Sequence, residues 1–413
     1  MVRQHRICLN MVGLFRAKQR EGRLSKTLNL AGVCAMLVAL TTLATVAPER
    51  AAAQQNTPDV AGDAWALADA DSGRILAGEN QDEQIQMAST AKVMTALVVL
   101  ESDVNLDEEV VISDSAEEYV GDVYSNIGLI SGETVTVRDL LAASLIPSGT
   151  DADYALAEYV GGGSVEQFVQ QMNQKAEELG LENTNFTNPT GIDAENNYSS
   201  AADLLEITSA AMEYDLFREL VGQTQATIQT QGVEDREIEV FTTNELLTQY
   251  PPANGVKTGT SSSAGYMLIS SAEAQGESYL AAVLGTDTEE AVNTASEELL
   301  RYAFGSYEQR PLVEEGQVYD EKEIPFRSRT IELTAADTIS ATVEEGANVE
   351  RNIRGGELPD SAQQGDEVGQ IEVVVNGESV GTSALLAAES YDEAPWWQKI
   401  TGSVTGWVSG LFG

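Results

Sequence analysis

The chain has 413 residues, enough for two domains with a sizeable core, and carries a formal net charge of −43. Its only histidine, His5, and its only cysteines, Cys8 and Cys34, all lie within the first 53 residues. Without that segment the chain can have no Ser-His-Asp triad, cysteine nucleophile, disulfide or His/Cys zinc site, so a covalent enzyme would use Ser or Thr as nucleophile and Lys, Tyr, Asp or Glu as base.

The N-terminal 53 residues have the pattern of a secretory signal. Seven basic residues precede an apolar run from Leu28 to Val46, and Ala51-Ala52-Ala53 follows that run. A basic region, an apolar region and small residues at a cleavage site are typical of export signals. We predict cleavage after residue 53, with residues 54–62 as a polar linker. The alternative is a retained membrane anchor, because the apolar run is close to spanning length.

Cleavage would make the protein still more acidic. It removes eight basic and two acidic residues, which leaves 15 basic and 64 acidic residues and a net charge of −49. Such a surface repels nucleic acid and does not bind anionic lipid through charge. It stays soluble at high salt, where self-repulsion is screened, so we expect a salt-adapted protein.

Residues 63–308 mix strand and helix patterns and form a predicted catalytic domain. Trp65–Gly78 has the pattern of a hairpin that turns at Asp71-Ser72-Gly73. Two apolar segments around Gly276 indicate an antiparallel pair of strands within residues 254–284. Helices are predicted at residues 88–101, 137–160, 165–180 and 288–305, the second of them broken at Pro147-Ser148-Gly149.

The remainder of the chain has a different composition. Residues 309–390 show only short strand patterns, and Asn376-Gly377 is a strong hairpin signal, so we predict a separate small β domain. Residues 394–413 carry apolar side chains at helical spacing, including Trp396 and Trp407, which predicts an amphipathic helix lying in a membrane interface. The alternative is a helix packed on the protein's own surface.

Ser89-Thr90-Ala91-Lys92 is a candidate nucleophile and base. Ser89 is expected at the start of a helix, and Lys92 lies one turn later on the same face, so its amine can reach the hydroxyl. A helix N-terminus offers free N–H groups to an oxyanion, and a buried lysine can lose its proton near neutral pH. The pattern is common by itself, but only five lysines remain after residue 53.

Two further motifs follow. Lys257-Thr258-Gly259-Thr260 precedes a predicted strand, where a cation and a hydroxyl could hold a substrate carboxylate and Gly259 allows close approach. The alternative is a surface turn. Ser148-Gly149-Thr150 lies at the helix break, where an ordinary turn is the alternative.

Taken together, the three motifs follow the order Ser-x-x-Lys, Ser-x-Asn and Lys-Thr-Gly of penicillin-binding proteins and serine β-lactamases. The segments MASTAKVMTALVVLE, GLENTNFTNPTGID and NGVKTGTSSSAGYMLISSA resemble those of low-molecular-mass D-alanyl-D-alanine carboxypeptidases. The resemblance spans residues 60–305 and extends less specifically to the β domain and the C-terminal helix. It implies an α/β (α+β) fold, with a penicillin-binding protein/β-lactamase-like domain of antiparallel sheet flanked by helices, plus a small C-terminal β domain.

The resemblance also implies the chemistry. Ser89 would attack the carbonyl between the two terminal D-alanines of a peptidoglycan stem peptide, and Lys92 would take its proton. Ser148 would relay a proton toward the leaving amine. Water would then release the acyl-enzyme, whereas β-lactams would acylate Ser89 and stay. No cofactor and no metal site are implied.

Substrate binding is implied at the remaining motif positions. Lys257 and Thr258 would hold the terminal carboxylate, and the backbone N–H groups of Ser89 and Thr260 would form the oxyanion hole. Thr150 and Gly259 would complete the substrate site. The expected partners are the stem peptide, β-lactam inhibitors and a membrane surface, with no nucleic acid. The expected location is the outer face of the cytoplasmic membrane, the periplasm or the cell-wall space.

The sequence departs from the family pattern in two places. Thr150 stands where the family usually has Asn, and one hydroxyl cannot supply both the donor and the acceptor of an amide. The family often has an arginine after the Lys-Thr-Gly strands, but Gly276–Leu300 contains none. Carboxylate binding would therefore rest more heavily on Lys257.

Three other functions are compatible with parts of the pattern. A class A β-lactamase needs a deacylating glutamate in a Glu-x-x-Leu-Asn context, and none occurs between Thr150 and Lys257. A D,D-endopeptidase acting on cross-links is a near variant of the carboxypeptidase. A non-catalytic cell-wall-binding protein is the alternative from another class, and Thr150 favours it.

Overall fold

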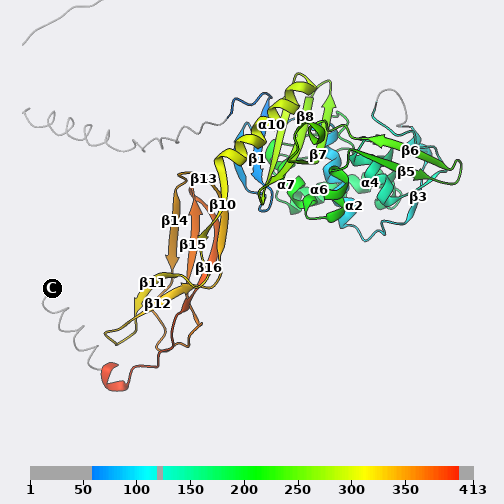
Figure 1. Ribbon diagram of the computed structural model, residues 1–413. Helices are drawn as coiled ribbons and strands as arrows, with labels where there is room; N and C mark the ends of the chain where they lie inside the picture. The colour runs from blue at the N-terminus through cyan, green and yellow to red at the C-terminus, as the bar shows by residue number, and fades with distance from the viewer. Residues whose placement is uncertain (1–57, 119–123, 400–413) are drawn as a thin grey trace, which may run out of the picture. The chain divides into compact units, whose positions relative to one another are not determined.

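The computed structural model describes residues 58–118 and 124–399 (Figure 1). The predicted signal at residues 1–53 and most of the predicted helix at residues 394–413 lie outside these residues. In the described part of the chain, no helix is both long and apolar enough to span a bilayer.

A five-stranded antiparallel sheet forms the centre of the first domain, in the order β2-β1-β9-β8-β7. Its strands are β1 (Ala64–Asp69), β2 (Ile75–Glu79), β7 (Ala253–Ser261), β8 (Gly265–Ala274) and β9 (Glu277–Thr286). The predicted first hairpin is confirmed, because β1 and β2 pair and the Gly73 N–H donates to the Asp69 carbonyl across the turn. The predicted strand pair around Gly276 is also confirmed as β8 and β9.

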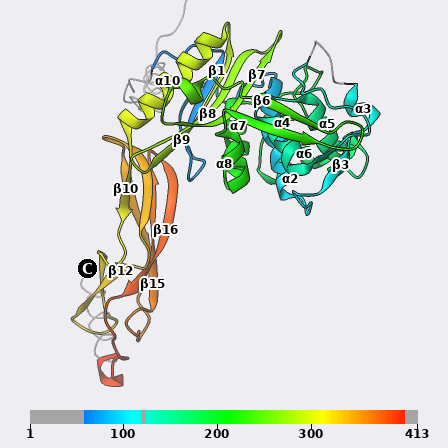
Figure 2. The same cartoon turned by 45° about the vertical axis from the view of Figure 1, so that its right-hand side comes forward.

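The sheet is buried on both faces. Trp65 and Leu67 of β1 contact one core, which includes the apolar face of α10 (Glu289–Ser306) and Leu246 of α9 (Leu246–Gln249). Ala66 and Ala68 contact a second core, which is formed with helices on the other side of the sheet. This alternation follows from the two-residue period of a strand. Figures 1 and 2 show α10 on one side of the sheet and α7 on the other.

The second core joins the sheet to a group of helices and small two-stranded sheets. The predicted helices at residues 88–101, 137–160 and 165–180 lie here, and the second is interrupted at Pro147-Ser148-Gly149 as expected. The sequence patterns did not reveal α7, α8 or the β5–β6 hairpin. The elements of this region are η1 (Ala88–Ala91), α2 (Lys92–Glu101), β3 (Glu109–Val111), α3 (Asp114–Glu117), β4 (Thr134–Thr136), α4 (Val137–Leu145), α5 (Thr150–Val160), α6 (Val165–Glu178), α7 (Ala201–Met212), α8 (Asp215–Val221), β5 (Gln225–Thr230), β6 (Arg236–Phe241) and α9 (Leu246–Gln249).

The C-terminal region is a β domain with its own core. Five strands form one sheet in the order β11-β12-β16-β15-β14, and β10 pairs with β13. Asn376 and Gly377 both have positive φ at the turn between β15 and β16, which confirms the predicted hairpin. The boundary expected at residue 309 falls inside β10. The strands are β10 (Tyr307–Val313), β11 (Val318–Glu323), β12 (Thr330–Ala335), β13 (Ile339–Glu344), β14 (Val349–Arg354), β15 (Glu367–Val375) and β16 (Glu378–Ala387).

Candidate active site

Ser89 lies on a short 3-10 turn rather than in the first turn of one long helix. The predicted helix at residues 88–101 is divided into η1 and α2, and Lys92 is the first residue of α2. Ser89 is half-buried and lines a cleft of about 540 Å³, whereas Lys92 is fully buried behind it. The hydroxyl thus opens toward solvent while the amine is held in the protein interior.

Close backbone packing fixes the turn that carries Ser89. Gly191 packs so tightly that a Cβ atom there would lie 1.6 Å from the Ala88 carbonyl oxygen. Gly259 of β7 lies on another side, where a Cβ atom would be 3.1 Å from the Thr90 side chain. Larger residues at either glycine would displace the turn, so both glycines help to set the position of Ser89.

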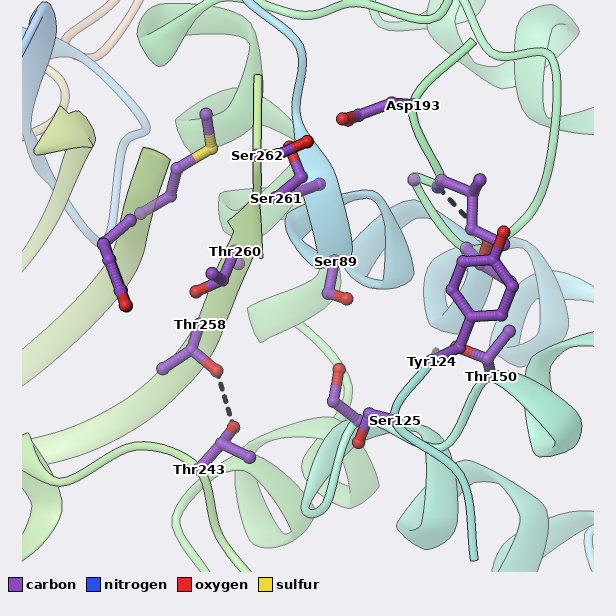
Figure 3. Close-up of a pocket in the computed structure, with 18 of the residues that line it drawn as sticks. Ser89, Tyr124, Ser125, Thr150, Asp193, Thr243, Thr258, Thr260, Ser261 and Ser262 are labelled. Carbon is purple, nitrogen blue, oxygen red and sulfur yellow. Dashed lines mark hydrogen bonds between the residues drawn. The ribbon is translucent and has the colours of Figure 1, made fainter. Parts of the chain in front are cut away.

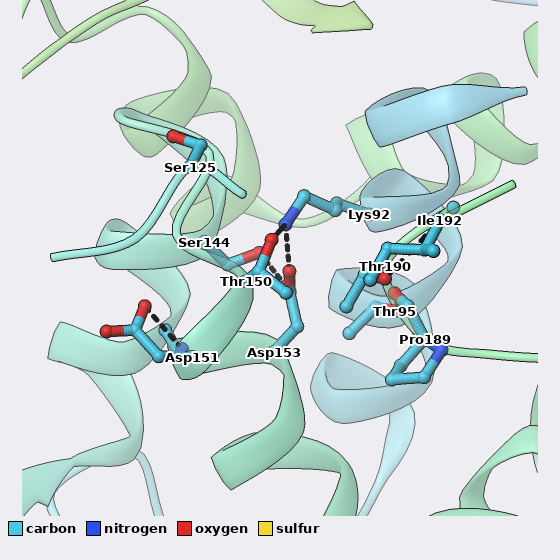
Figure 4. A network of polar contacts seen from close by, with 12 residues as sticks. Lys92, Thr95, Ser125, Ser144, Thr150, Asp151, Asp153, Pro189, Thr190 and Ile192 are labelled. Carbon is cyan, nitrogen blue, oxygen red and sulfur yellow. Dashed lines mark hydrogen bonds and ion pairs between the residues drawn. The ribbon is translucent and has the colours of Figure 1, made fainter. Parts of the chain in front are cut away.

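The Lys92 side chain enters a fully buried polar network (Figure 4). Its Nζ atom lies 3.3 Å from the Thr150 Oγ1 atom and forms an ion pair with the Asp153 carboxylate, whose other oxygen accepts from the Ser144 hydroxyl. Burial raises the pKa of Asp153, and the interactions with Lys92, Ser144 and Lys257 only partly offset this.

Ser148 and Thr150 lie where α4 gives way to α5. Ser148 has a φ of +67°, and the next N–H group, of Gly149, donates to the Ala143 carbonyl over 2.8 Å. Thr150 begins α5, and its N–H donates to the Ser125 carbonyl over 2.8 Å. The Ser148 Oγ atom is buried and has no hydrogen-bond partner among the described residues. It is therefore available to another group in the cleft.

Lys257 lies in β7, with only 1% of its surface exposed. Its Nζ atom donates to the carbonyl of Thr258 over 3.0 Å. Burial, together with the charge of Lys92, lowers the pKa of Lys257 to about 7, although Asp153 acts in the opposite direction. The ammonium is thus behind the cleft surface, where its charge is little screened by solvent.

The cleft joins these segments (Figure 3). Ser89 lies between Thr258 and Thr260 on the β7 side and Ser125 and Thr150 on the helical side. Of the sequence-predicted site residues, Ser89, Ser148, Thr150, Thr258, Gly259 and Thr260 line the cleft, while Lys92 and Lys257 lie buried beneath it.

Several cleft residues were not predicted from the sequence. The Thr243 hydroxyl lies 2.5 Å from that of Thr258, and Asp193 accepts from Ser263 at the rim. The end of the cleft near α10 is lined by Glu289 and Asn293, and none of the described residues that line the cleft is an arginine. Asp153, which is fully buried and does not line the cleft, was also not predicted, although its i+3 position from Thr150 on α5 is a recognisable sequence signal. Thr243 and Asp193 lie on loops and Glu289 and Asn293 lie on α10, and only tertiary folding brings these segments together.

Sequence comparisons divide the chain into the same two domains. A family model described as D-alanyl-D-alanine carboxypeptidase matches residues 50–288, and a model described as penicillin-binding protein 5, C-terminal domain, matches residues 307–393. The chain is 32% identical over 365 residues to the D-alanyl-D-alanine carboxypeptidase DacF of Bacillus subtilis, which covers 85% of this chain and 92% of that protein.

Solved structures give the same result. Penicillin binding protein 5 from Haemophilus influenzae matches with a TM-score of 0.67 and 27% identity, over 81% of this chain and 99% of that chain. The Streptomyces K15 DD-transpeptidase matches with a TM-score of 0.58 and 36% identity, over 60% of this chain and 99% of that chain. The first of these matches extends beyond the domain that contains the cleft.

Proposed function

The chain belongs to the D-alanyl-D-alanine carboxypeptidase family, and we propose from this premise that Ser89 is its nucleophile and Lys92 the base that activates it. The protein is a serine-type D-Ala-D-Ala carboxypeptidase acting on peptidoglycan stem peptides and binding β-lactams. One observation carries the residue assignment: Ser89 lines the cleft, while Lys92, three residues later, is fully buried and its Nζ atom contacts Thr150, which lines the same cleft.

Acylation would begin when the Ser89 Oγ atom attacks the carbonyl carbon between the two terminal D-alanines. The Lys92 amine takes the hydroxyl proton, and the N–H groups of Ser89 and Thr260 stabilise the oxyanion. The C–N bond then breaks, and Ser148 passes the proton to the departing amine. The unpartnered Ser148 hydroxyl supports this relay, because it has a free donor and acceptor beside the cleft.

Carboxylate recognition would combine a buried cation with surface hydroxyls. Thr258 and Thr243 present their hydroxyls to the cleft, and Lys257 supplies positive charge from behind. This charge is effective because Lys257 is buried and solvent screens it little. Thr150 and Gly259 line the rest of the substrate site. Free D-alanine leaves, and water hydrolyses the acyl-enzyme to complete the cycle.

Benzylpenicillin followed by intact-mass analysis tests the nucleophile. We expect one stable adduct on the wild-type protein, located at Ser89 by peptide mapping, and none on Ser89→Ala. Ser340→Ala is a matched control at an exposed position of β13 in the β domain and should label like wild type. Rapid multiple turnover of penicillin would instead indicate a β-lactamase, and an adduct on Ser89→Ala would refute the assignment.

Export and membrane association form a second part of the proposal. The N-terminal 53 residues would direct export and be removed, and residues 394–413 would lie in the interface of a membrane. Trp396, which is one of that segment's apolar positions, and the neighbouring Trp397 are both exposed. Deletion of residues 394–413 should abolish flotation with phosphatidylcholine vesicles while leaving penicillin labelling intact. Equal flotation of the full and shortened proteins would contradict this role.

A further inference from the structure

The ion pair between Lys92 and Asp153 is the feature of the site that the three motifs do not account for. It is the one ion pair of the described residues in which both side chains are fully buried. Removing two charges from water costs several kcal/mol per ion, in general about as much as their attraction returns. A pair of this kind, located on the base of the reaction, calls for a chemical role.

An ordinary ion pair would work against the proposed base. A carboxylate in contact with an ammonium favours the charged lysine, which has no lone pair with which to accept the Ser89 proton. The surroundings of Asp153 oppose this tendency, because the carboxyl is fully buried. Its neighbours are Lys92 from α2, Ser144 from α4 and the charge of Lys257 from β7.

Lys92 can become a free amine without any change in the number of protons that the Lys92–Asp153 pair holds. An ammonium with a carboxylate holds as many protons as an amine with a carboxylic acid, so one transfer along the existing hydrogen bond interconverts the two states. The pair keeps its net charge during that transfer. No solvent proton is needed, and the free amine of Lys92 appears in the same position.

We infer that Asp153 stores the proton of Lys92 and so keeps this lysine available as a base throughout the reaction. Asp153 acts through Lys92 and does not contact the substrate, so it is a positioning residue. The inference rests on the proposed role of Lys92 as base.

The steps balance. Lys92 passes a proton to Asp153 and then takes the Ser89 proton as the new C–O bond forms. When the C–N bond breaks, that proton leaves through Ser148 to the amine, so the acyl-enzyme contains neutral Lys92 and protonated Asp153. In deacylation, Lys92 takes a proton from the attacking water and returns it to the Ser89 oxygen as the ester bond breaks. The proton on Asp153 can then return to Lys92.

Asp153 and Thr150 both contact the Nζ atom of Lys92. Thr150 offers Lys92 a single hydroxyl, whereas the family's usual asparagine offers an amide. Asp153 lies one helical turn later and binds the same Nζ atom, so it gives the Lys92 ammonium an acceptor in addition to the single hydroxyl of Thr150. The departure at position 150 thus coincides with an additional carboxylate beside the lysine.

Asp153→Asn separates this role from an ordinary ion pair by the direction in which the pH profile moves. If Asp153 stores the proton, the acid limb of kcat/KM lies at the pH where the pair takes up a second proton. The asparagine variant then has to deprotonate Lys92 into solvent, so its acid limb moves to higher pH. At a pH below both acid limbs, the kcat/KM of Asp153→Asn relative to wild type should fall about tenfold for each pH unit by which the limb has moved. If Asp153 merely holds an ammonium, its removal moves the acid limb to lower pH.

Three further measurements make the test decisive. Asp153→Glu, which keeps a carboxylate, should restore the limb toward that of wild type, and Asp139→Asn on α4, a matched change outside the cleft, should leave it unchanged. Infrared difference spectra of the penicillin acyl-enzyme should contain a protonated carboxyl band that Asp153→Asn lacks. An acid limb that moves down or stays fixed, or the absence of that band, overturns the inference. Continued activity of Ser89→Ala would instead refute the proposed function itself.

Discussion

The Nζ atom of Lys92 lies 3.3 Å from the Oγ1 atom of Thr150, so threonine contacts the proposed base at the position where the family usually has asparagine. We expect Thr150→Val to lower kcat/KM about tenfold, because a hydrogen bond to a charged group contributes about 1.5 kcal/mol. Thr150→Ser keeps the hydroxyl and should stay near wild type. Initial rates of D-alanine release check this, and equal losses in the two variants would show that the hydroxyl has no role.

Lys257 should give the reaction a basic limb. Its pKa is lowered to about 7, so it is charged below that pH and neutral above it. Because the charged form attracts the substrate carboxylate, we expect kcat/KM to fall as pH rises through about 7. A substrate amidated at its C-terminus should react slowly and without this limb. The same limb on the amidated substrate would assign it to another group.

Glu133 should contribute strongly to stability. It is fully buried and accepts hydrogen bonds from Arg236 at 2.6 and 2.7 Å and from Thr230 at 3.0 Å. Glu133→Gln leaves the Arg236 charge without its partner and should lower the free energy of unfolding by about 3 kcal/mol. Glu389→Gln breaks an exposed pair with Arg329 and should cost less than about 1 kcal/mol. Urea denaturation measures both, and equal costs would contradict this account.

The pH dependence of that stability has a defined sign. Burial opposes ionisation of Glu133, but hydrogen bonds from Arg236, the Ile130 N–H group and Thr230 outweigh it and hold its pKa below the ordinary 4.5. The contribution is therefore fully present above pH 4.5 and is lost as pH falls through the lowered pKa. The difference in free energy of unfolding between wild type and Glu133→Gln should become smaller in that acidic range. A difference that does not change with pH would show that ionisation of Glu133 is not its cause.

Salt should stabilise the fold. A net charge of −43 for the whole sequence produces strong self-repulsion, which ions screen. We expect Tm to rise steadily between low salt and molar KCl, and to rise less in sucrose at equal osmolality. Thermal scans of one preparation in both series check this. A Tm that is independent of KCl would contradict the expectation of salt adaptation.

The sequence predicted the parts of the fold whose signals are local. Asn376-Gly377 marked the β15–β16 hairpin because both residues adopt positive φ, and Pro147 marked the break between α4 and α5. The buried helix α7 was missed because apolar residues cover most of its surface, which leaves little periodic contrast. The β5–β6 hairpin was missed although Ala226, Ile228, Ile238 and Val240 pack on the core, because each strand contributes only two apolar residues to that face.

The residues of the candidate site that were predicted are likewise those with a local sequence signal. Ser89, Ser148 and Thr258 were found because they belong to short motifs, and the structure brings all three to one cleft. Thr243 belongs to no motif and approaches Thr258 only through folding. The spacing of residues in a motif also does not predict how deeply each side chain is buried. Lys257, expected just before a strand and within reach of a substrate carboxylate, has only 1% of its surface exposed.

The most direct test of the account is D-alanine release from a peptide ending in D-Ala-D-Ala, measured in high salt. Wild-type protein and Ser89→Ala are compared at equal concentration, with circular dichroism showing that both are folded. We predict release by wild type and loss of release by Ser89→Ala to the uncatalysed background. Equal release by the two proteins would contradict the assignment of Ser89 as the nucleophile.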